Sequence, residues 1–228
     1  MTNYLAPFAL AVLMTSAACA DDQTPAPAAA KPAPAAKPMP AAKPVANAAA
    51  PAATPASAVP HYVQAAAGNS LAFIFDQTGA ETAGSFRQFA TTFDYDEKNP
   101  GASKLRVKVQ IASLDTQDAD RDSALASADL FDAQKYPTAT YVADSLTKSA
   151  DGGLVAAGSL TLRGVTKPLR VPLAVRATAT GLELSGETQL KRLDFGVGQG
   201  DFKSTESVGD VVKLRYKVAL VKAPESAK

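Results

Sequence analysis

Apolar and polar residues alternate along several stretches in the second part of this chain. In residues 105–111 every second side chain is apolar, and the side chains between them are basic or carry an amide. The same alternation recurs in residues 169–177 and 212–220, and in residues 71–75 the large side chains of Leu71, Phe73 and Phe75 fall on one face. A period of two is typical of β-strands with one buried face and one face in water.

Further apolar stretches of similar length lie between turn-forming residues, at 89–96, 139–146, 154–164 and 182–193. Gly, Pro, Asn and Asp separate these stretches, as expected for turns. About eight such strands predict an all-β domain, a single antiparallel sheet curled into a barrel with water outside. Regular helices that could cover both faces are missing from the pattern, which argues against a parallel α/β sheet.

One segment departs from the alternation. In residues 118–130, Asp118 and Asp120 are candidate helix N-caps, and apolar residues follow at helical spacing. This spacing predicts one short helix near residues 121–130, packed across one end of the barrel. The Tyr136-Pro137 pair then ends this non-strand segment, and the next strand is expected to begin at Thr138.

The first 20 residues have the composition of an export signal, an apolar run followed by small residues that is too short for a durable membrane span. Two processing hypotheses remain open. In one, Ser16-Ala17-Ala18-Cys19 is a lipoprotein box and an acylated Cys19 tethers the protein to a membrane. In the other, cleavage before Asp21 releases a soluble protein. Both predict an exported, periplasmic protein.

Composition divides the rest of the chain. Residues 21–60 are almost entirely Ala, Pro and Lys, and they offer too little bulky apolar surface to offset the entropy of ordering, so we expect a disordered linker. Residues 61–222 have the composition of one globular domain, and residues 223–228 form a tail. The formal net charge of +1, without a long basic block, argues against nucleic acid as a partner.

The side chains available for chemistry are few. The single cysteine lies in the export segment, and the single histidine, His61, lies at the start of the domain, so the common nucleophile–base pairs cannot be assembled. We therefore predict a protein that is not an enzyme and requires no cofactor. The spacing of Asp118, Asp120, Asp122 and Asp129 resembles a calcium loop, but Ser123 stands where that loop needs Gly. Helix capping and pairing with Arg121 explain these residues better, and no metal site is predicted.

A basic corner around Gly164 separates two of the predicted strands. Arg163, Lys167 and Arg170 surround the glycine, and Pro168 limits further strand pairing. Two interpretations remain open for these three basic residues. They form either a structural hairpin turn with solvated charges or a site for a polar head group.

Many short motifs, in one order along the chain, resemble those of the YceI-like family of exported proteins. They are Gly84-Ser85-Phe86 with Phe89, residues 112–116, Arg121-Asp122 with Leu125, Phe131-Asp132, residues 136–140, Gly158, residues 160–168 and residues 192–198. The resemblance covers about Asn69 to Leu220. The chain departs from the family at Asn69, where many relatives have His, and at Phe202, where a Trp is expected.

The resemblance implies a lipocalin-like barrel whose apolar interior holds a long isoprenoid chain, often of the quinone type. The expected ligand is therefore an isoprenoid lipid or quinone. Candidate lining residues are the aromatic and branched side chains of the inward faces: Phe73, Phe75, Phe86, Phe89, Phe93, Val109, Phe131, Tyr141, Leu160, Leu162, Leu173 and Phe195.

Three functional hypotheses follow from the sequence. The leading one is non-catalytic binding, transport or storage of a long-chain isoprenoid lipid in the cell envelope. The alternative is a barrel filled by its own side chains that acts through its surface, as an envelope stress or protein-interaction module. An enzyme acting on a lipid inside the barrel is the third. A homodimer is compatible with each of them.

Overall fold

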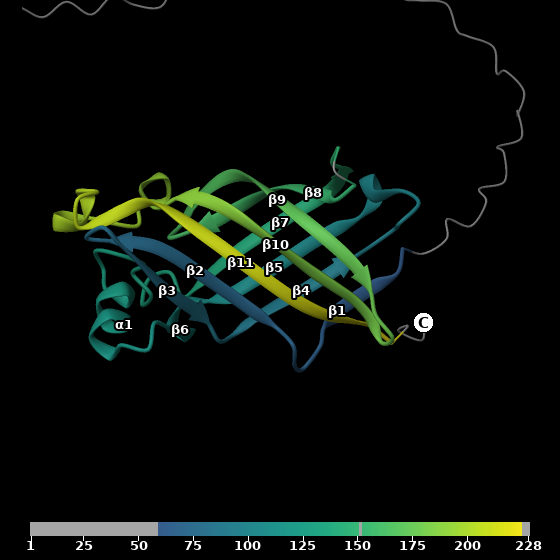
Figure 1. The fold of residues 1–228 in the computed structure, drawn as a ribbon, viewed down its shortest axis with the longest axis horizontal. Coiled ribbons are helices and arrows are strands. Elements are labelled where there is room, and N and C mark those ends of the chain that lie inside the picture. The colour runs from purple at the N-terminus through teal and green to yellow at the C-terminus, as the bar shows by residue number, and fades with distance from the viewer. Residues whose placement is uncertain (1–58, 151, 225–228) are drawn as a thin grey trace, which may run out of the picture. The chain divides into compact units, whose positions relative to one another are not determined.

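The barrel is seen in a computed structural model that describes residues 59–150 and 152–224 (Figure 1). Its strands are β1 (His61–Gln64), β2 (Ser70–Gln77), β3 (Ala80–Phe86), β4 (Phe89–Asp94), β5 (Lys104–Gln110), β6 (Leu114–Asp115), β7 (Thr138–Lys148), β8 (Leu154–Leu162), β9 (Val165–Ala177), β10 (Gly181–Lys191) and β11 (Val208–Lys222). One α-helix, α1 (Ala119–Ala126), follows β6. Four 3-10 turns complete the described elements: η1 (Pro100–Ala102), η2 (Ile111–Ser113), η3 (Arg192–Phe195) and η4 (Gly200–Lys203).

Eight of these strands form a closed antiparallel ring in the order β1-β4-β5-β7-β8-β9-β10-β11. The ring closes because β11 pairs with β1 near the end of the chain, where Val221 lies opposite Val63. The earlier part of β11 pairs instead with β2, and β3 and β6 extend the sheet from there. The predicted all-β barrel of about eight strands with one helix is thus confirmed.

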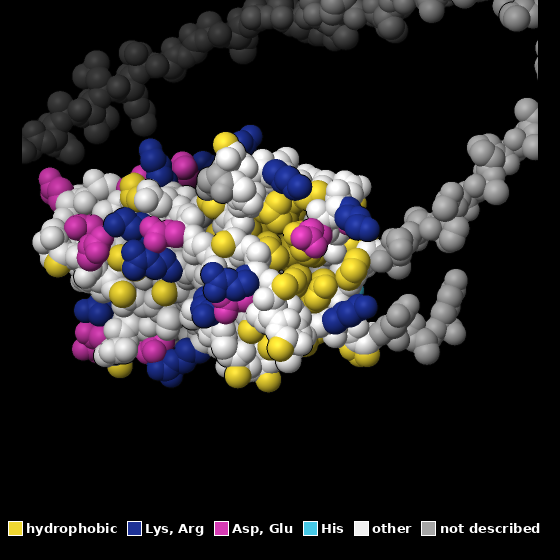
Figure 2. Space-filling model, turned by 45° about the vertical axis from the view of Figure 1, so that its right-hand side comes forward, with side chains coloured by type: hydrophobic (Ala, Val, Ile, Leu, Met, Phe, Trp, Pro, Cys, Tyr) yellow, Lys and Arg dark blue, Asp and Glu magenta, His cyan; other side chains and the backbone are white. Residues whose placement is uncertain are grey.

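The alternation in the sequence matches the two faces of the wall. In β5, Leu105 and Val109 are buried, whereas Arg106 and Lys108 are exposed. Figure 2 shows charged side chains of both signs over the outside of the barrel, and hydrophobic side chains gathered on the right-hand side of this face. The strands β1, β3 and β6 were not predicted, because they are short or lack an apolar alternation.

The apolar interior divides into two clusters of buried side chains. We call the first the packed end; it comprises Phe93, Leu105, Tyr141, Ala143, Leu146, Leu154, Ala156, Val171, Leu173, Leu182, Leu184, Val218 and Leu220. We call the second the hollow end; it comprises Phe73, Phe75, Val109, Ile111, Leu114, Leu125, Leu130, Ala139, Leu162, Phe195 and Val197. The strands β5, β7 and β8 supply residues to both ends.

The helix α1 belongs to the hollow end. Asp118 is its N-cap, because the backbone N–H of Arg121 donates to Asp118 Oδ1 at 3.0 Å. The side chain of Asp122 accepts hydrogen bonds from the backbone N–H and the hydroxyl of Thr116, at 2.8 and 2.6 Å. The helix ends at Ala126, four residues before the predicted end, because the following residues form a series of turns. Leu125 is its buried residue and faces the barrel interior.

Several sequence predictions concern residues outside the described part. The export segment, Cys19 and most of the predicted linker belong to residues 1–58, and the end of the tail belongs to residues 225–228. Within the described residues, no helix has the length and apolar character needed to cross a membrane.

Candidate functional site: an apolar channel in the barrel

The hollow end encloses a cavity of about 450 Å³, which we call the outer chamber. Its walls come from β2, β8, β10, β11 and α1, and most of its lining side chains are apolar. This volume falls in the range of about 300–1,000 Å³ that is usual for ligand pockets in proteins. The polar residues of its lining are Gln77, Asp118, Asp120, Arg121 and Arg192.

A second cavity of about 110 Å³, the inner chamber, extends from the outer chamber toward the packed end. Five side chains line both chambers, namely Leu71, Val109, Ala139, Leu160 and Leu214. The two chambers are therefore neighbours that share these side chains as walls, and we call them together the apolar channel. The inner chamber is bounded by packed-end residues such as Leu173 and Leu184.

Three phenylalanines form part of the wall of the outer chamber. The ring centroids of Phe73 and Phe86 are 5.1 Å apart, and those of Phe86 and Phe131 are 6.2 Å apart in an edge-to-face arrangement. These spacings are those of favourable aromatic pairs. The rings hold one another in place, so the wall of the chamber is built before any ligand arrives.

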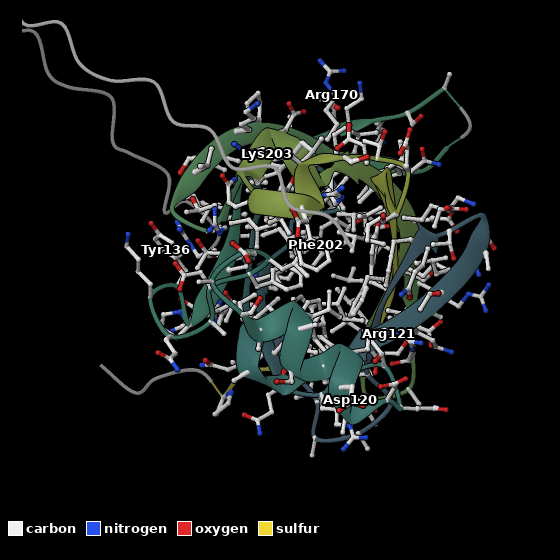
Figure 3. All side chains as sticks on the ribbon, turned by 90° about the vertical axis from the view of Figure 1, so that its left-hand side faces the viewer. Asp120, Arg121, Tyr136, Arg170, Phe202 and Lys203 are labelled. Carbon is white, nitrogen blue, oxygen red and sulfur yellow. The ribbon has the colours of Figure 1, made fainter. Side chains whose placement is uncertain are left out.

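The mouth of the channel lies between α1 and η4 (Figure 3). Asp120 and Arg121 lie on α1 at one side, and Phe202 projects over the opening from the other side. Arg121 forms an ion pair with Asp118 at 3.5 Å. The N-terminal backbone of the helix, through the N–H of Arg121, holds the pKa of the Asp118 carboxyl below its usual value. Asp118, Asp120 and Arg121 thus place charged groups at the mouth, and Arg192 is the other charged residue of the lining.

Arg192 is the buried cation of the hollow end, with 3% of its surface exposed. Its guanidinium donates five hydrogen bonds to backbone carbonyls, those of Val197, Phe202, Ser204, Val208 and Gly209, at 2.7–3.2 Å. Burial lowers its pKa, and the carboxylate of Asp210 opposes that shift. With its donors used in this way, Arg192 holds together the segment between β10 and β11 that carries η4 and one side of the mouth.

The structure places the predicted lining residues in three groups. Those on the outer chamber are Phe73, Phe75, Phe86, Val109, Phe131, Leu160 and Leu162. Those on the inner chamber are Phe89, Tyr141 and Leu173, together with Val109 and Leu160. The remaining two line neither chamber: Phe93 is fully buried against Tyr95 in the packed end, and Phe195 is buried in the wall beside an outer groove.

The basic corner is a two-residue hairpin between β8 and β9. Arg163 and Gly164 both have positive φ, of 49° and 75°, as a tight hairpin requires, and Leu162 pairs with Val165 across the turn. Arg163 donates to the carbonyls of Ala128 and Gly196, at 2.5 and 2.6 Å, and Lys167 pairs with Asp194 at 3.0 Å. Arg170 is exposed on the outside of the barrel.

Several residues of the channel were not predicted from the sequence. They are Gln77, Asp118, Asp120 and Arg121 at the mouth, Arg192, and the apolar side chains Leu71, Leu125, Leu130, Leu190, Val197, Phe202, Val208, Val212 and Leu214. The alternation in residues 212–220 was a usable signal for the last two of these. The polar ones carried no signal, because their side chains reach the mouth only through the placement of α1 and η4.

The two departures from the family have different structural settings. Asn69 lies where the chain bends between β1 and β2; its amide donates to the carbonyl of Ala65 at 2.6 Å and accepts from the backbone N–H of Ala219 at 3.0 Å. It therefore joins the bend to β11. Phe202 lines the outer chamber, so the change from the expected Trp lies at the mouth itself.

The described residues contain no group of three or more His, Cys, Asp or Glu side chains that could hold a metal ion. His61 is exposed and its Nδ1 lies 2.5 Å from Asp94 Oδ1. Neither residue lines a chamber.

Comparison with known proteins identifies the fold and the family. Residues 62–220 match the model of the YceI-like domain. The chain is 39% identical over 122 residues to protein YceI of Escherichia coli O17:K52:H18, a match that covers 50% of this chain and 62% of that protein. It is 37% identical over 132 residues to UPF0312 protein plu2095 of Photorhabdus laumondii, covering 54% of this chain and 68% of that protein.

Two solved structures have the same fold and are more than 25% identical to this chain over the aligned residues. BcnA of Burkholderia cenocepacia superposes with a TM-score of 0.64 at 26% identity, over 66% of this chain and 94% of that one. The YceI protein of Campylobacter jejuni superposes with a TM-score of 0.55 at 27% identity, over 62% and 85%. With its barrel, its motifs and a family match over most of its length, this chain belongs to the YceI-like family.

Proposed function

We propose that the barrel binds the hydrocarbon chain of an isoprenoid lipid, of the polyprenyl or quinone type, and carries or stores it in the cell envelope without chemical conversion. The observation that carries this proposal is the pair of neighbouring chambers with shared apolar walls inside the barrel. A long, mostly apolar interior with Asp118, Asp120 and Arg121 at its mouth suits a long hydrocarbon chain with a polar end.

One solved structure of this fold is described with the same ligand class. A domain from Saccharophagus degradans, described as polyisoprenoid binding, has this fold, with a TM-score of 0.57 at 17% identity. It covers 72% of this chain and 98% of that one. The shared fold supports a comparable interior, and the proposal of a ligand for this chain rests on its own channel.

The binding energy would come from burial of hydrocarbon. Each methylene transferred from water to an apolar site contributes about 0.8 kcal/mol. A few isoprene units therefore offset the cost of immobilising the ligand without any polar contact. Such a site needs no catalytic groups, which agrees with the structural roles of Arg192 and Arg163.

The unfilled channel disfavours the alternative of a barrel filled by its own side chains. An empty apolar cavity lowers stability in proportion to its volume. A barrel that acted only through its outer surface would gain nothing from that loss, whereas a lipid-binding barrel recovers it when the ligand enters.

Native mass spectrometry of protein purified without detergent tests the proposal. We expect an added mass that solvent extraction releases as a prenyl lipid, or uptake of an added nonaprenol by the extracted protein. Ala139 lines both chambers, so the variant Ala139→Phe would fill the neck between them and abolish this uptake.

The matched control is Ala90→Phe, which adds the same ring at an exposed position on β4. This control should bind as the unchanged protein does. An unchanged protein that carries no lipid and takes up no nonaprenol would refute the proposed function. Equal uptake by both variants would refute the assignment of the channel as the site.

Residues 1–20 and Cys19 lie outside the described residues, so export and lipidation remain predictions. A homodimer also remains a prediction. A shift in mass of the membrane-extracted protein on Cys19→Ser would distinguish a lipid-anchored form from a soluble one.

A further inference from the structure

The barrel wall is split between β9 and β10. These strands pair only near their shared hairpin, from Ala177 opposite Leu182 to Ala174 opposite Ser185. Beyond that point, residues 165–173 pair with β8 alone, and residues 186–191 pair with β11 alone. In the described part of the chain, no backbone ladder joins these two stretches, so the ring is held there without the hydrogen bonds that close it elsewhere.

Two prolines explain why the ladder stops. In an antiparallel strand, alternate residues direct their backbone N–H and C=O groups to opposite neighbours. The carbonyls of Arg170 and Pro172 accept from side chains on β10 and β11, which shows that this set of residues faces the split. Pro168 and Pro172 belong to that set and have no N–H to donate.

Side chains bridge the split in place of the backbone. The hydroxyl of Tyr216, on β11, donates to the carbonyl of Pro172, and the hydroxyl of Thr188 donates to the carbonyl of Arg170 at 3.1 Å. The ion pair of Lys167 with Asp194 joins the two sides farther along. These are separate, weak links that can break without unfolding a strand.

Gly186 makes the Tyr216 link possible. A Cβ at this position would collide with the hydroxyl of Tyr216 and with the carbonyl of Pro172. The absence of a side chain lets the phenol cross beneath β10 and reach β9. Gly186 is also the residue at which β10 leaves β9, so the link lies where the split begins.

A groove of about 320 Å³ occupies the outer side of the split. Leu169 lines both this groove and the inner chamber, and Leu190 lines both the groove and the outer chamber. The wall between channel and groove is therefore one side chain thick at these two positions. Val211, which is 45% exposed, adds apolar surface outside, and Lys167 and Lys191 flank the groove.

We propose that this groove is a second binding site, a lateral portal that holds the hydrocarbon chain of the isoprenoid ligand as it passes into or out of the channel. The proposal rests on the proposed function. A hydrocarbon chain that enters at the split passes Leu169 and Leu190, between the flanking Lys167 and Lys191. It reaches the channel where the wall is one side chain thick.

A cross-link across the split tests the portal. In the full-length Cys19→Ser protein, Arg170→Cys and Gln189→Cys place two exposed thiols on opposite sides of the groove. A short bismaleimide then holds β9 and β10 together. We expect uptake of nonaprenol from vesicles to slow by at least about tenfold, because the cross-link blocks the motion that opens the route, with unchanged final occupancy.

The matched control joins β10 to β11, which are already paired: Gln189→Cys with Lys213→Cys, opposite one another in the ladder. It should slow uptake by less than about twofold, since no gating motion is blocked. Equal rates for both cross-links would overturn the portal while leaving the proposed function intact. A lack of uptake by the unmodified protein would instead refute the proposed function, and the portal with it.

A second variant acts in the opposite direction. Tyr216→Phe removes one bridging hydrogen bond while keeping the ring, so uptake should accelerate by about fivefold, the rate equivalent of one hydrogen bond. The control Thr161→Val removes a hydroxyl that bonds to that of Thr166 at 2.8 Å, between β8 and β9, strands that remain paired, and neither residue lines a chamber or the groove. Acceleration by the control to the same degree, or none by Tyr216→Phe, would overturn the role of the split.

Discussion

The packed end and the hollow end of this barrel share the strands β5, β7 and β8 but are stabilised by different means. Of the five largest apolar side chains that are fully buried, Phe93, Leu146, Leu184 and Leu220 belong to the packed end, and Ile111 belongs to the hollow end. The hollow end instead relies on polar links, such as the five hydrogen bonds of Arg192.

The difference indicates that stability and binding are separated along the barrel. Close packing contributes most per side chain where no void remains. Around the channel the side chains face empty volume, so the chain there is held by bonds that need no filled interior. Four predictions test this division.

The largest effect is expected at Arg192. Replacement by Met keeps most of the volume but leaves five buried or partly buried carbonyls without this donor, so the free energy of unfolding should fall by about 3–5 kcal/mol. Urea denaturation measures this change. Arg170→Met, at an exposed position, should alter stability by less than about 0.5 kcal/mol. A similar small change at Arg192 would show that the hollow end does not depend on its polar links.

A pair of identical truncations compares the two ends directly. Leu146→Ala, at a packed-end side chain that is 1% exposed, should cost about 3–4 kcal/mol. Leu160→Ala, in the wall of both chambers, should cost about 1–2 kcal/mol, because that side chain makes fewer contacts to lose. Unfolding by urea would give both values, and equal costs would contradict the division.

The pH dependence of stability reports how dry the inner chamber is. Burial raises the pKa of Tyr141 to about 12 from its usual value of 10.0. Because the folded state then holds its proton longer than the unfolded state, stability is fully present below pH 10 and is lost as the pH rises toward 12, by about 2 kcal/mol.

Tyrosinate absorbance and urea unfolding across this pH window would measure the effect. The variant Tyr141→Phe should lose correspondingly less stability over the same range. An ordinary titration near pH 10 in the unchanged protein would mean that water fills the inner chamber.

The smallest predicted effect is an increase in the free energy of unfolding. Thr91 is 2% exposed, lines the inner chamber, and its hydroxyl has no hydrogen-bond partner among the described residues. Thr91→Val should therefore raise the free energy of unfolding by about 1 kcal/mol. Ser103 is equally buried, but its hydroxyl accepts from the backbone N–H of Asp96 at 3.0 Å, so Ser103→Ala should lower stability. Changes of the same sign in both variants would contradict this account.

Local pattern was sufficient to predict the barrel. Alternation in residues 105–111 and 212–220 identified which side chains point inward, since period two is a property of any strand, and Asp118 identified the start of the helix. The inward faces also contained most of the residues that line the channel, because lining and core residues share the same chemistry.

Only the tertiary structure decided which inward residues meet and which enclose a void. Phe93 and Phe73 both lie on inward faces, yet one is packed against Tyr95 and the other lines the outer chamber. The split at Pro168 and Pro172 is a second example. The sequence shows that these two positions have no backbone N–H to donate, and the closure of the ring determines that this edge of the strand faces β10. Pairing between distant strands sets these distances, and no local pattern contains them.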